Sequence, residues 1–184
     1  GLGIAETAYQ NSLSYAQERK QGKSNNNKDN KTDEIIKHAD IRRSLLNMKS
    51  IIQGQRSLAF WLSQQIDVSL NHTNEKIRKN AEDLVSLMTP VVKSFFTDMG
   101  TEITNEAIQV FGGYGYTKDQ GIEQLYRDNR ITPIYEGTNS VQAIDLVFRK
   151  VLNNKILFNF TSIVKEEIKI NQETSELKEF SKIL

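Results

Sequence analysis

Apolar residues recur every three or four positions along most of the chain, which is the spacing of one face of an α-helix. Four stretches follow this spacing, at residues 2–16, 41–66, 77–110 and 139–151. No alternation typical of a β-strand persists for more than four residues. The pattern therefore predicts an all-α protein, an antiparallel up-and-down four-helix bundle with short connections.

The breaks between these stretches predict where helices begin and end. Asn71–Asn74 supply a break and an N-cap candidate. Gly112–Gly113 supply a C-terminal cap. Pro90 lies inside the third stretch and is expected to kink or divide that helix, because it lacks the N–H that a helix uses. Residues 111–138 contain five glycines, four tyrosines and Pro133, and are expected to be irregular.

Polar stretches divide the chain into a bundle and an extension. Residues 20–33 contain no apolar side chain, and the Asn-rich segment 24–33 is expected to form a solvated, mobile loop. The bundle domain is expected to occupy residues 1–152. Residues 153–184 are rich in Lys and Glu with a weaker amphipathic pattern, and are expected to form a C-terminal helical extension.

Composition narrows the classes of function. The 184 residues carry a net charge of +1, which offers no electrostatic footprint for nucleic acid. There is no cysteine, hence no disulfide framework, and His38 and His72 are isolated, so no metal site is expected. No apolar run approaches the roughly 18 residues that span a bilayer. Gly1–Ile4 lack an initiator Met and a signal peptide's pattern, so they read as the middle of a longer polypeptide.

Three segments contain residues that could carry chemistry, and each has a structural alternative. The glycines of 109–116 would let another molecule approach the backbone, or would simply cap a helix and form a turn. Glu136, in 134–139, would act as a general base in a pocket, or as a first-turn acid favoured by the helix dipole. The basic residues of 15–23 would contact a cofactor phosphate, or complement the dipole of a helix C-terminus.

These segments together resemble the C-terminal helical domain of the FAD-dependent acyl-CoA dehydrogenases over residues 1–152. The resemblance rests on Glu18–Lys23, Gln109–Tyr116, Arg127–Asp128, Arg130–Ile131 and Tyr135–Asn139, in this order. The Arg-Lys-Gln-Gly form and the polar insertion resemble the branch that contains 3-methylmercaptopropionyl-CoA dehydrogenase. The chain departs from the common form by lacking a Phe between Gln21 and Gly22, and by having His38–Ala39 where many members have His-Gln.

The resemblance implies α,β-dehydrogenation of an acyl-CoA thioester, with FAD taking the hydride and Glu136 abstracting the α-proton. It implies that Gly137 lies beside the substrate. The cofactor-binding residues that it implies are Arg19, Gln21, Gln109, Gly112, Gly113, Thr138 and Asn139, some of them contacting the FAD of a neighbouring subunit.

The resemblance also implies a homodimer or homotetramer and an electron-transferring flavoprotein or similar acceptor. A bacterial cytoplasm is favoured over a mitochondrial matrix. Family members have an N-terminal helical domain and a middle β-domain that supply much of the site, so we predict no turnover from these 184 residues alone. The alternative is a stand-alone helical interaction module that kept the fold and lost the chemistry.

Overall fold

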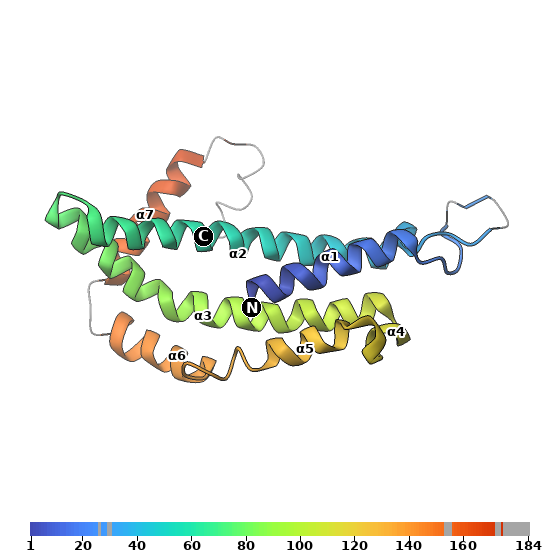
Figure 1. The fold of residues 1–184 in the computed structure, drawn as a ribbon. Coiled ribbons are helices and arrows are strands. Elements are labelled where there is room, and N and C mark those ends of the chain that lie inside the picture. Colours follow the sequence, from blue (N-terminus) through green and yellow to red (C-terminus); the bar gives the residue numbers. More distant parts are fainter. Residues whose placement is uncertain (26, 29–30, 153–155, 172–173, 175–184) are drawn as a thin grey trace. The chain divides into compact units, whose positions relative to one another are not determined.

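The computed structural model describes residues 1–25, 27–28, 31–152, 156–171 and 174. Within these ranges the regular structure is helical, with no β-strand, so the all-α prediction is confirmed (Figure 1). The elements are α1 (Leu2–Glu18), η1 (Ile35–Lys37), α2 (Ala39–Asn71), α3 (Glu75–Phe111), α4 (Gly113–Tyr116), η2 (Lys118–Gln120), α5 (Ile122–Arg130), α6 (Asn139–Asp145), the π-helical η3 (Leu146–Val151) and α7 (Ile156–Asn171).

The chain divides into two compact units. Unit 1 comprises Gly1–Phe60 and Val92–Asn139, and unit 2 comprises Trp61–Val91 and Ser140–Leu184. The long helices α2 and α3 contribute one half to each unit. All of the residues proposed above as sites belong to unit 1.

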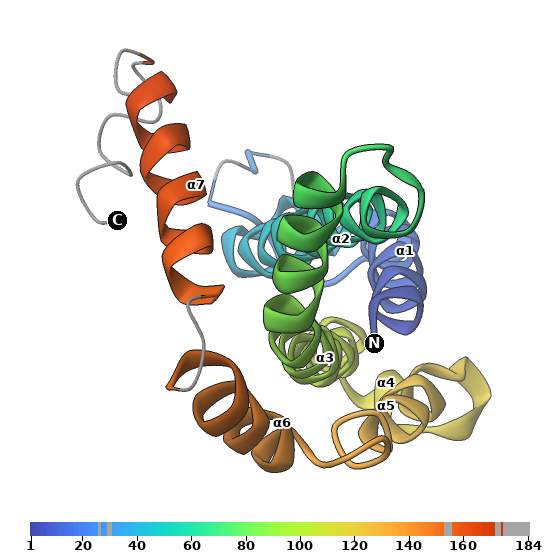
Figure 2. The same ribbon diagram turned by 90° about the vertical axis from the view of Figure 1, so that its left-hand side faces the viewer.

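The core of unit 1 is built from α1, the first half of α2, the second half of α3, and α5. Small residues of α1 let the neighbouring helices approach closely, because Ala5, Ala8 and Ala16 are fully buried. Larger apolar side chains from the other helices fill the remaining space, among them Met48, Ile52, Ile103, Val110 and Ile122. Both views show α5 beside the second half of α3 (Figure 1; Figure 2).

Unit 2 has a smaller core of Leu62, Ala81, Leu84, Leu87 and Met88. Its C-terminal part is joined to α3 by Lys150, whose Nζ donates a hydrogen bond to Ser86 Oγ at 2.6 Å. None of the helices in the described ranges combines the length and the apolar composition that crossing a membrane requires.

Several predicted boundaries are confirmed. Asn74 caps α3, since its Oδ1 accepts hydrogen bonds from the N–H groups of Lys76 at 2.9 Å and Ile77 at 3.3 Å. Gly112, with a φ of 62°, follows the end of α3 at Phe111. The last bundle helix begins at Asn139 as predicted.

Of the two outcomes expected for Pro90, a kink or a division, division does not occur: α3 continues through the proline, which removes a single helical N–H. The expectation that residues 111–138 are irregular is wrong, since α4, η2 and α5 lie there. In α5, Ile122 and Asn129 face the core, while Arg127 Nε donates to Glu123 Oε2 at 2.7 Å one turn away.

The expected mobile loop at residues 24–33 is anchored at its base. The N–H of Gln21 donates to the carbonyl of Asp33, and the N–H of Asp33 donates to the carbonyl of Gly22. Lys20 and Glu34 form an isolated antiparallel bridge beside them. Residues 26, 29 and 30 lie outside the described residues, as do 153–155, 172–173 and 175–184 of the predicted extension, in which α7 is described.

Candidate functional site

Five of the predicted cofactor-binding residues line one hollow in unit 1. Arg19 and Gln21 follow α1, Gln109 lies near the end of α3, and Gly112 and Gly113 follow it. The hollow has a volume of about 780 Å³. Its other lining residues are Tyr15, Gly22, Ile35, His38, Asp40, Ile41, Val110, Phe111, Tyr114 and Thr117.

Aromatic side chains join the ends of α1 and α3 beside this hollow. The rings of Tyr15 and Phe111 stack with their centroids 4.1 Å apart and an interplanar angle of 15°. The Arg19 guanidinium lies 5.5 Å from the centroid of the Tyr114 ring, within the range of a cation–π interaction. The Arg19 guanidinium is thereby held beside the aromatic side chains that line the hollow.

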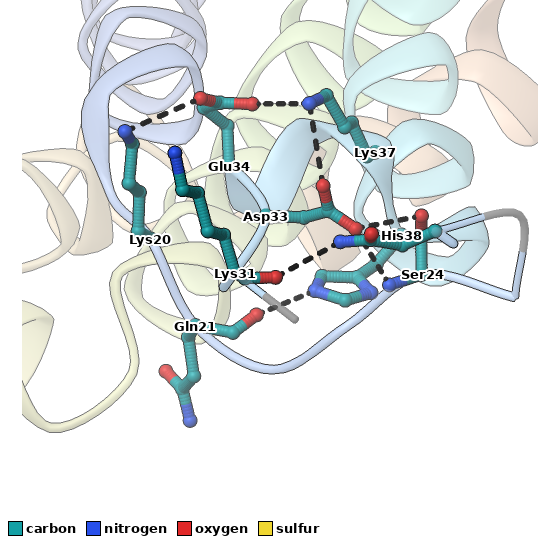
Figure 3. Close-up of polar contacts among 9 residues, drawn as sticks. Lys20, Gln21, Ser24, Lys31, Asp33, Glu34, Lys37 and His38 are labelled. Carbon is teal, nitrogen blue, oxygen red and sulfur yellow. Dashed lines mark hydrogen bonds and ion pairs between the residues drawn. The ribbon is translucent and has the colours of Figure 1, made fainter. Parts of the chain in front are cut away.

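The backbone after α1 is held in place by the segment that precedes α2. The N–H of Ile35 donates to the carbonyl of Arg19 at 2.8 Å. His38 Nε2 lies 2.7 Å from the carbonyl oxygen of Gln21 (Figure 3). His38 therefore helps to orient the chain at Gln21, one of the predicted cofactor residues, a role that its isolation in the sequence does not reveal.

Asp33 is the buried charge of this region. Its Oδ2 accepts hydrogen bonds from the N–H of Ser24 at 2.9 Å and from Ser24 Oγ at 2.8 Å, and Lys37 Nζ lies 3.3 Å from Oδ1 (Figure 3). The Ser24 N–H, then the Ser24 hydroxyl, and more weakly the Asn27 amide and Lys37, hold the pKa of this carboxyl well below its ordinary value. The charged form of Asp33 therefore stabilises the base of the polar loop, which comprises residues 24–33.

The residues around the hollow fit an anionic dinucleotide. Arg19 supplies a cation for a pyrophosphate, and Gln21 and Gln109 supply amide donors and acceptors. A Cβ built on Gly112 or Gly113 would meet nothing within 4 Å, so the backbone there faces open space that a ligand can approach. This donor set suits FAD, the cofactor that the sequence motifs imply.

The predicted catalytic segment lies between α5 and α6, away from these five residues. Glu136 is exposed and has a φ of 55°, and Gly137 follows with a φ of 79°. Among the described non-glycine residues, Glu136 alone has a positive φ. A bulky residue in this conformation costs about 1–3 kcal/mol and persists where the surrounding structure enforces it.

Lys93 of α3 contacts the segment around Glu136, and the sequence analysis did not predict this role for it. Its Nζ donates to the carbonyl of Gly137 at 2.9 Å and to Asn139 Oδ1 at 2.6 Å. The amide nitrogen of Asn139 in turn donates to Thr97 Oγ1 at 3.0 Å and to Asp98 Oδ1 at 2.7 Å. Asn139, predicted as a cofactor contact, thus directs its side chain to α3.

The structure therefore arranges the predicted residues in two groups along α3. One group surrounds Gln109, and the other is braced at Lys93, sixteen residues earlier on the same helix. At 1.5 Å per residue this separation is about 24 Å along the helix axis. Gly137 and Thr138 lie with Glu136 in the second group and are exposed.

Unit 1 is thus an all-helical domain with a hollow at the ends of α1 and α3 and a separate segment around Glu136 that Lys93 holds against α3. Residues 1–151 match the family "Acyl-CoA dehydrogenase, C-terminal domain". The chain belongs to the acyl-CoA dehydrogenase family, as its sequence motifs predicted.

Curated relatives agree with this assignment. The chain is 40% identical over 154 residues to 3-methylmercaptopropionyl-CoA dehydrogenase of Ruegeria pomeroyi, covering 84% of this chain and 26% of that protein. It is 36% identical over 154 residues to butyryl-CoA dehydrogenase of Syntrophomonas wolfei, covering 84% and 25%. The chain thus spans about a quarter of the length of these relatives.

A solved structure shows the same fold over nearly the whole chain. Caenorhabditis elegans ACDH-11 in complex with C11-CoA matches with a TM-score of 0.82 and 24% identity, covering 97% of this chain and 28% of that one. The likeness at this identity is one of fold.

Proposed function

We propose that this chain is the C-terminal domain of an FAD-dependent acyl-CoA dehydrogenase, in which Glu136 removes the α-proton of an acyl-CoA thioester. The observation that carries the proposal is the backbone of Glu136. A glutamate is held at positive φ in an exposed, braced segment, in a chain of this family. Strain of this kind concentrates at functional positions.

The chemistry assigned to the chain is proton transfer. The α-proton of a thioester is weakly acidic, so its removal needs a carboxylate placed against the carbon and a donor for the developing enolate oxygen. The Glu136 side chain takes the proton, and its backbone N–H serves as one such donor. FAD, when bound, accepts the hydride from the β-carbon, so that the substrate loses one proton and one hydride and gains a Cα–Cβ double bond.

The hollow at Arg19, Gln21, Gln109, Gly112 and Gly113 is proposed to bind the adenine-dinucleotide part of FAD. Its charge, its amides and its open glycine backbone support this role. Its separation from Glu136 along α3 suits contacts with the FAD of a neighbouring subunit, and hence a homodimer or homotetramer. Thr138 is proposed to lie near the cofactor beside the base, and Gly137 beside the substrate.

The same proposal extends to the surroundings of the enzyme. An electron-transferring flavoprotein or similar carrier would reoxidise the flavin. The match to a bacterial relative at 40% identity supports a bacterial enzyme. Its location in the cytoplasm is part of the proposal. We expect the 184 residues by themselves to show no turnover, since the family's other domains supply much of the site.

The proposal is tested by Glu136→Gln in the complete protein. The wild type, mixed anaerobically with a panel of acyl-CoA thioesters, should lose its oxidised flavin absorption. The variant should keep its flavin and lose this bleaching, because a neutral amide cannot accept the α-proton. Glu102→Gln, which alters an exposed glutamate elsewhere on α3, is the matched control and should bleach normally.

Two outcomes would count against the proposal. Normal bleaching of the Glu136→Gln variant would remove Glu136 from the role of base. A wild-type protein that binds no flavin and responds to no acyl-CoA would favour the interaction module that retains only the fold.

A further inference from the structure

We infer that Lys93 is a positioning residue of this enzyme, which holds the Glu136 segment in its reactive conformation through a charge-assisted tether. The inference rests on the proposed role of Glu136 as base. Lys93 lies on α3, 43 residues before Glu136 in the sequence and outside the segment 134–139 that contains the proposed base.

The tether consists of two hydrogen bonds from Lys93 to the residues that directly follow Glu136. Lys93 Nζ donates to the carbonyl of Gly137 at 2.9 Å and to the side-chain oxygen of Asn139 at 2.6 Å. Gly137 directly follows Glu136, and both have positive φ. An ammonium group donating to two oxygens makes stronger hydrogen bonds than a neutral donor does.

The charges around Asn139 fix the orientation of its amide. Lysine can only donate hydrogen bonds and an ionised aspartate can only accept them. The amide oxygen therefore faces Lys93, while the amide nitrogen faces Asp98 Oδ1 at 2.7 Å. Lys93 and Asp98, both on α3, thus bind the oxygen and the nitrogen of the Asn139 side-chain amide, respectively.

Thr97 completes the arrangement. Its hydroxyl donates to the carbonyl of Lys93 at 2.8 Å and accepts from Asn139 Nδ2 at 3.0 Å. The main-chain N–H of Asn139 also donates to the carbonyl of Pro133 at 3.1 Å, which closes the segment on itself. The end of the segment is thereby fixed at one place on α3.

Loss of the tether releases strain where the base is positioned. Without the ammonium group, the Gly137 carbonyl and the Asn139 oxygen lose their strongest donor, and Glu136 can relax toward negative φ. The carboxylate then moves with its backbone. Displacement of a reacting group by about 1 Å can cost about 100-fold in rate.

The test is Lys93→Met in the complete protein, because Met retains the length of the side chain and lacks the donors. We expect the rate of flavin reduction at saturating acyl-CoA to fall about 10–100-fold. Flavin content and the apparent dissociation constant for acyl-CoA should change far less. The kinetic isotope effect with α-deuterated substrate should rise, because proton removal becomes more rate-limiting.

Two further variants separate positioning from stability. Lys93→Arg restores a cation with several donors and should recover part of the rate. Lys49→Met removes an exposed lysine of α2 and should leave all of these quantities unchanged. Thermal unfolding of each variant identifies any general loss of structure.

The outcomes distinguish this inference from the proposed function. If the wild type is active and Glu136→Gln is inactive, but Lys93→Met reduces its flavin at the normal rate, Lys93 has no positioning role. Equal losses in Lys93→Arg and Lys93→Met with an unchanged isotope effect would also overturn it. If the wild type itself shows no reduction by any acyl-CoA, the proposed function fails first.

Discussion

Asn129 donates a hydrogen bond from its side-chain amide to the main-chain carbonyl of Thr97 at 3.2 Å. Ten residues further on, Asn139 donates to the hydroxyl of the same threonine at 3.0 Å. The segment that carries Glu136 lies between these two asparagines. Both of its ends are therefore fastened to one turn of α3, which explains how an exposed segment can keep an unfavourable backbone conformation.

Gly100 makes the first of these attachments sterically possible. A Cβ at Gly100 would lie 2.5 Å from Asn129 Oδ1. Asn129 is fully buried and also donates to Thr101 Oγ1 at 2.9 Å, so it cannot turn aside without losing hydrogen bonds. We expect Gly100→Ala to lower the free energy of unfolding by about 1–3 kcal/mol, measured by urea denaturation.

Gly54 provides the matched control for Gly100. It lies inside α2, and a Cβ there would meet nothing within 4 Å. Gly54→Ala should therefore be neutral or stabilise by about 0.5–1 kcal/mol, through helix propensity alone. In an Asn129→Ala background the cost of Gly100→Ala should shrink. An undiminished cost there would show that the clash with Asn129 is not its cause.

Asp33 should give the stability of the protein a component that depends on pH. Its folded-state pKa lies below the ordinary value of 3.8, so the ionised carboxylate stabilises the fold above that value. This contribution is lost as the pH falls from about 4 toward the lower folded-state pKa. Asp33→Asn should be less stable than the wild type near neutral pH, with a difference that narrows in acid.

Urea denaturation at about pH 7 and about pH 3 measures this narrowing. Asp119→Asn, at an exposed aspartate of η2, is the control and should match the wild type near neutral pH. A wild-type advantage over Asp33→Asn that is equally large at both values would mean that the hydrogen bonds at Asp33 do not depend on its charge.

Arg19 should contribute to flavin affinity. If its guanidinium contacts a cofactor phosphate, Arg19→Met in the complete protein should weaken FAD binding about 10–100-fold, as expected for loss of a hydrogen bond to a charged group. Equilibrium dialysis of the flavin measures the effect. Arg42→Met, at an exposed position of α2, is the control. Unchanged affinity in Arg19→Met would place the phosphates elsewhere.

The sequence predicts the helices well where an apolar stripe is long. The stretches at 2–16 and 41–66 each fall within one helix, and the start of α6 at Asn139 is as expected. The helix α5 is missed because its inward face is short and partly polar, with Asn129 buried in place of an apolar residue. Glycine-rich composition then suggests irregular chain, although Gly112 and Gly121 only separate the helices.

The candidate site is predictable as a set of residues but not as an arrangement. Motifs indicate Arg19, Gln109 and Glu136, whereas the supporting contacts of Lys93 and Asp33 arise from tertiary packing or loop closure. Lys93 looks like any solvated lysine of a helix, since its partners lie 44 and 46 residues further along the chain. Periodicity along one helix carries no information about such a distant partner.

The backbone hydrogen bonds at the base of the polar loop allow the length of that loop to vary. Because residues 19–22 and 33–35 are hydrogen-bonded to each other, the chain between them begins and ends at fixed, neighbouring points. Its length can then change at little entropic cost and without shifting Arg19 or Gln21. A peptide tag or a fluorescent reporter inserted into this segment should therefore leave the backbone at Arg19 and Gln21 in place.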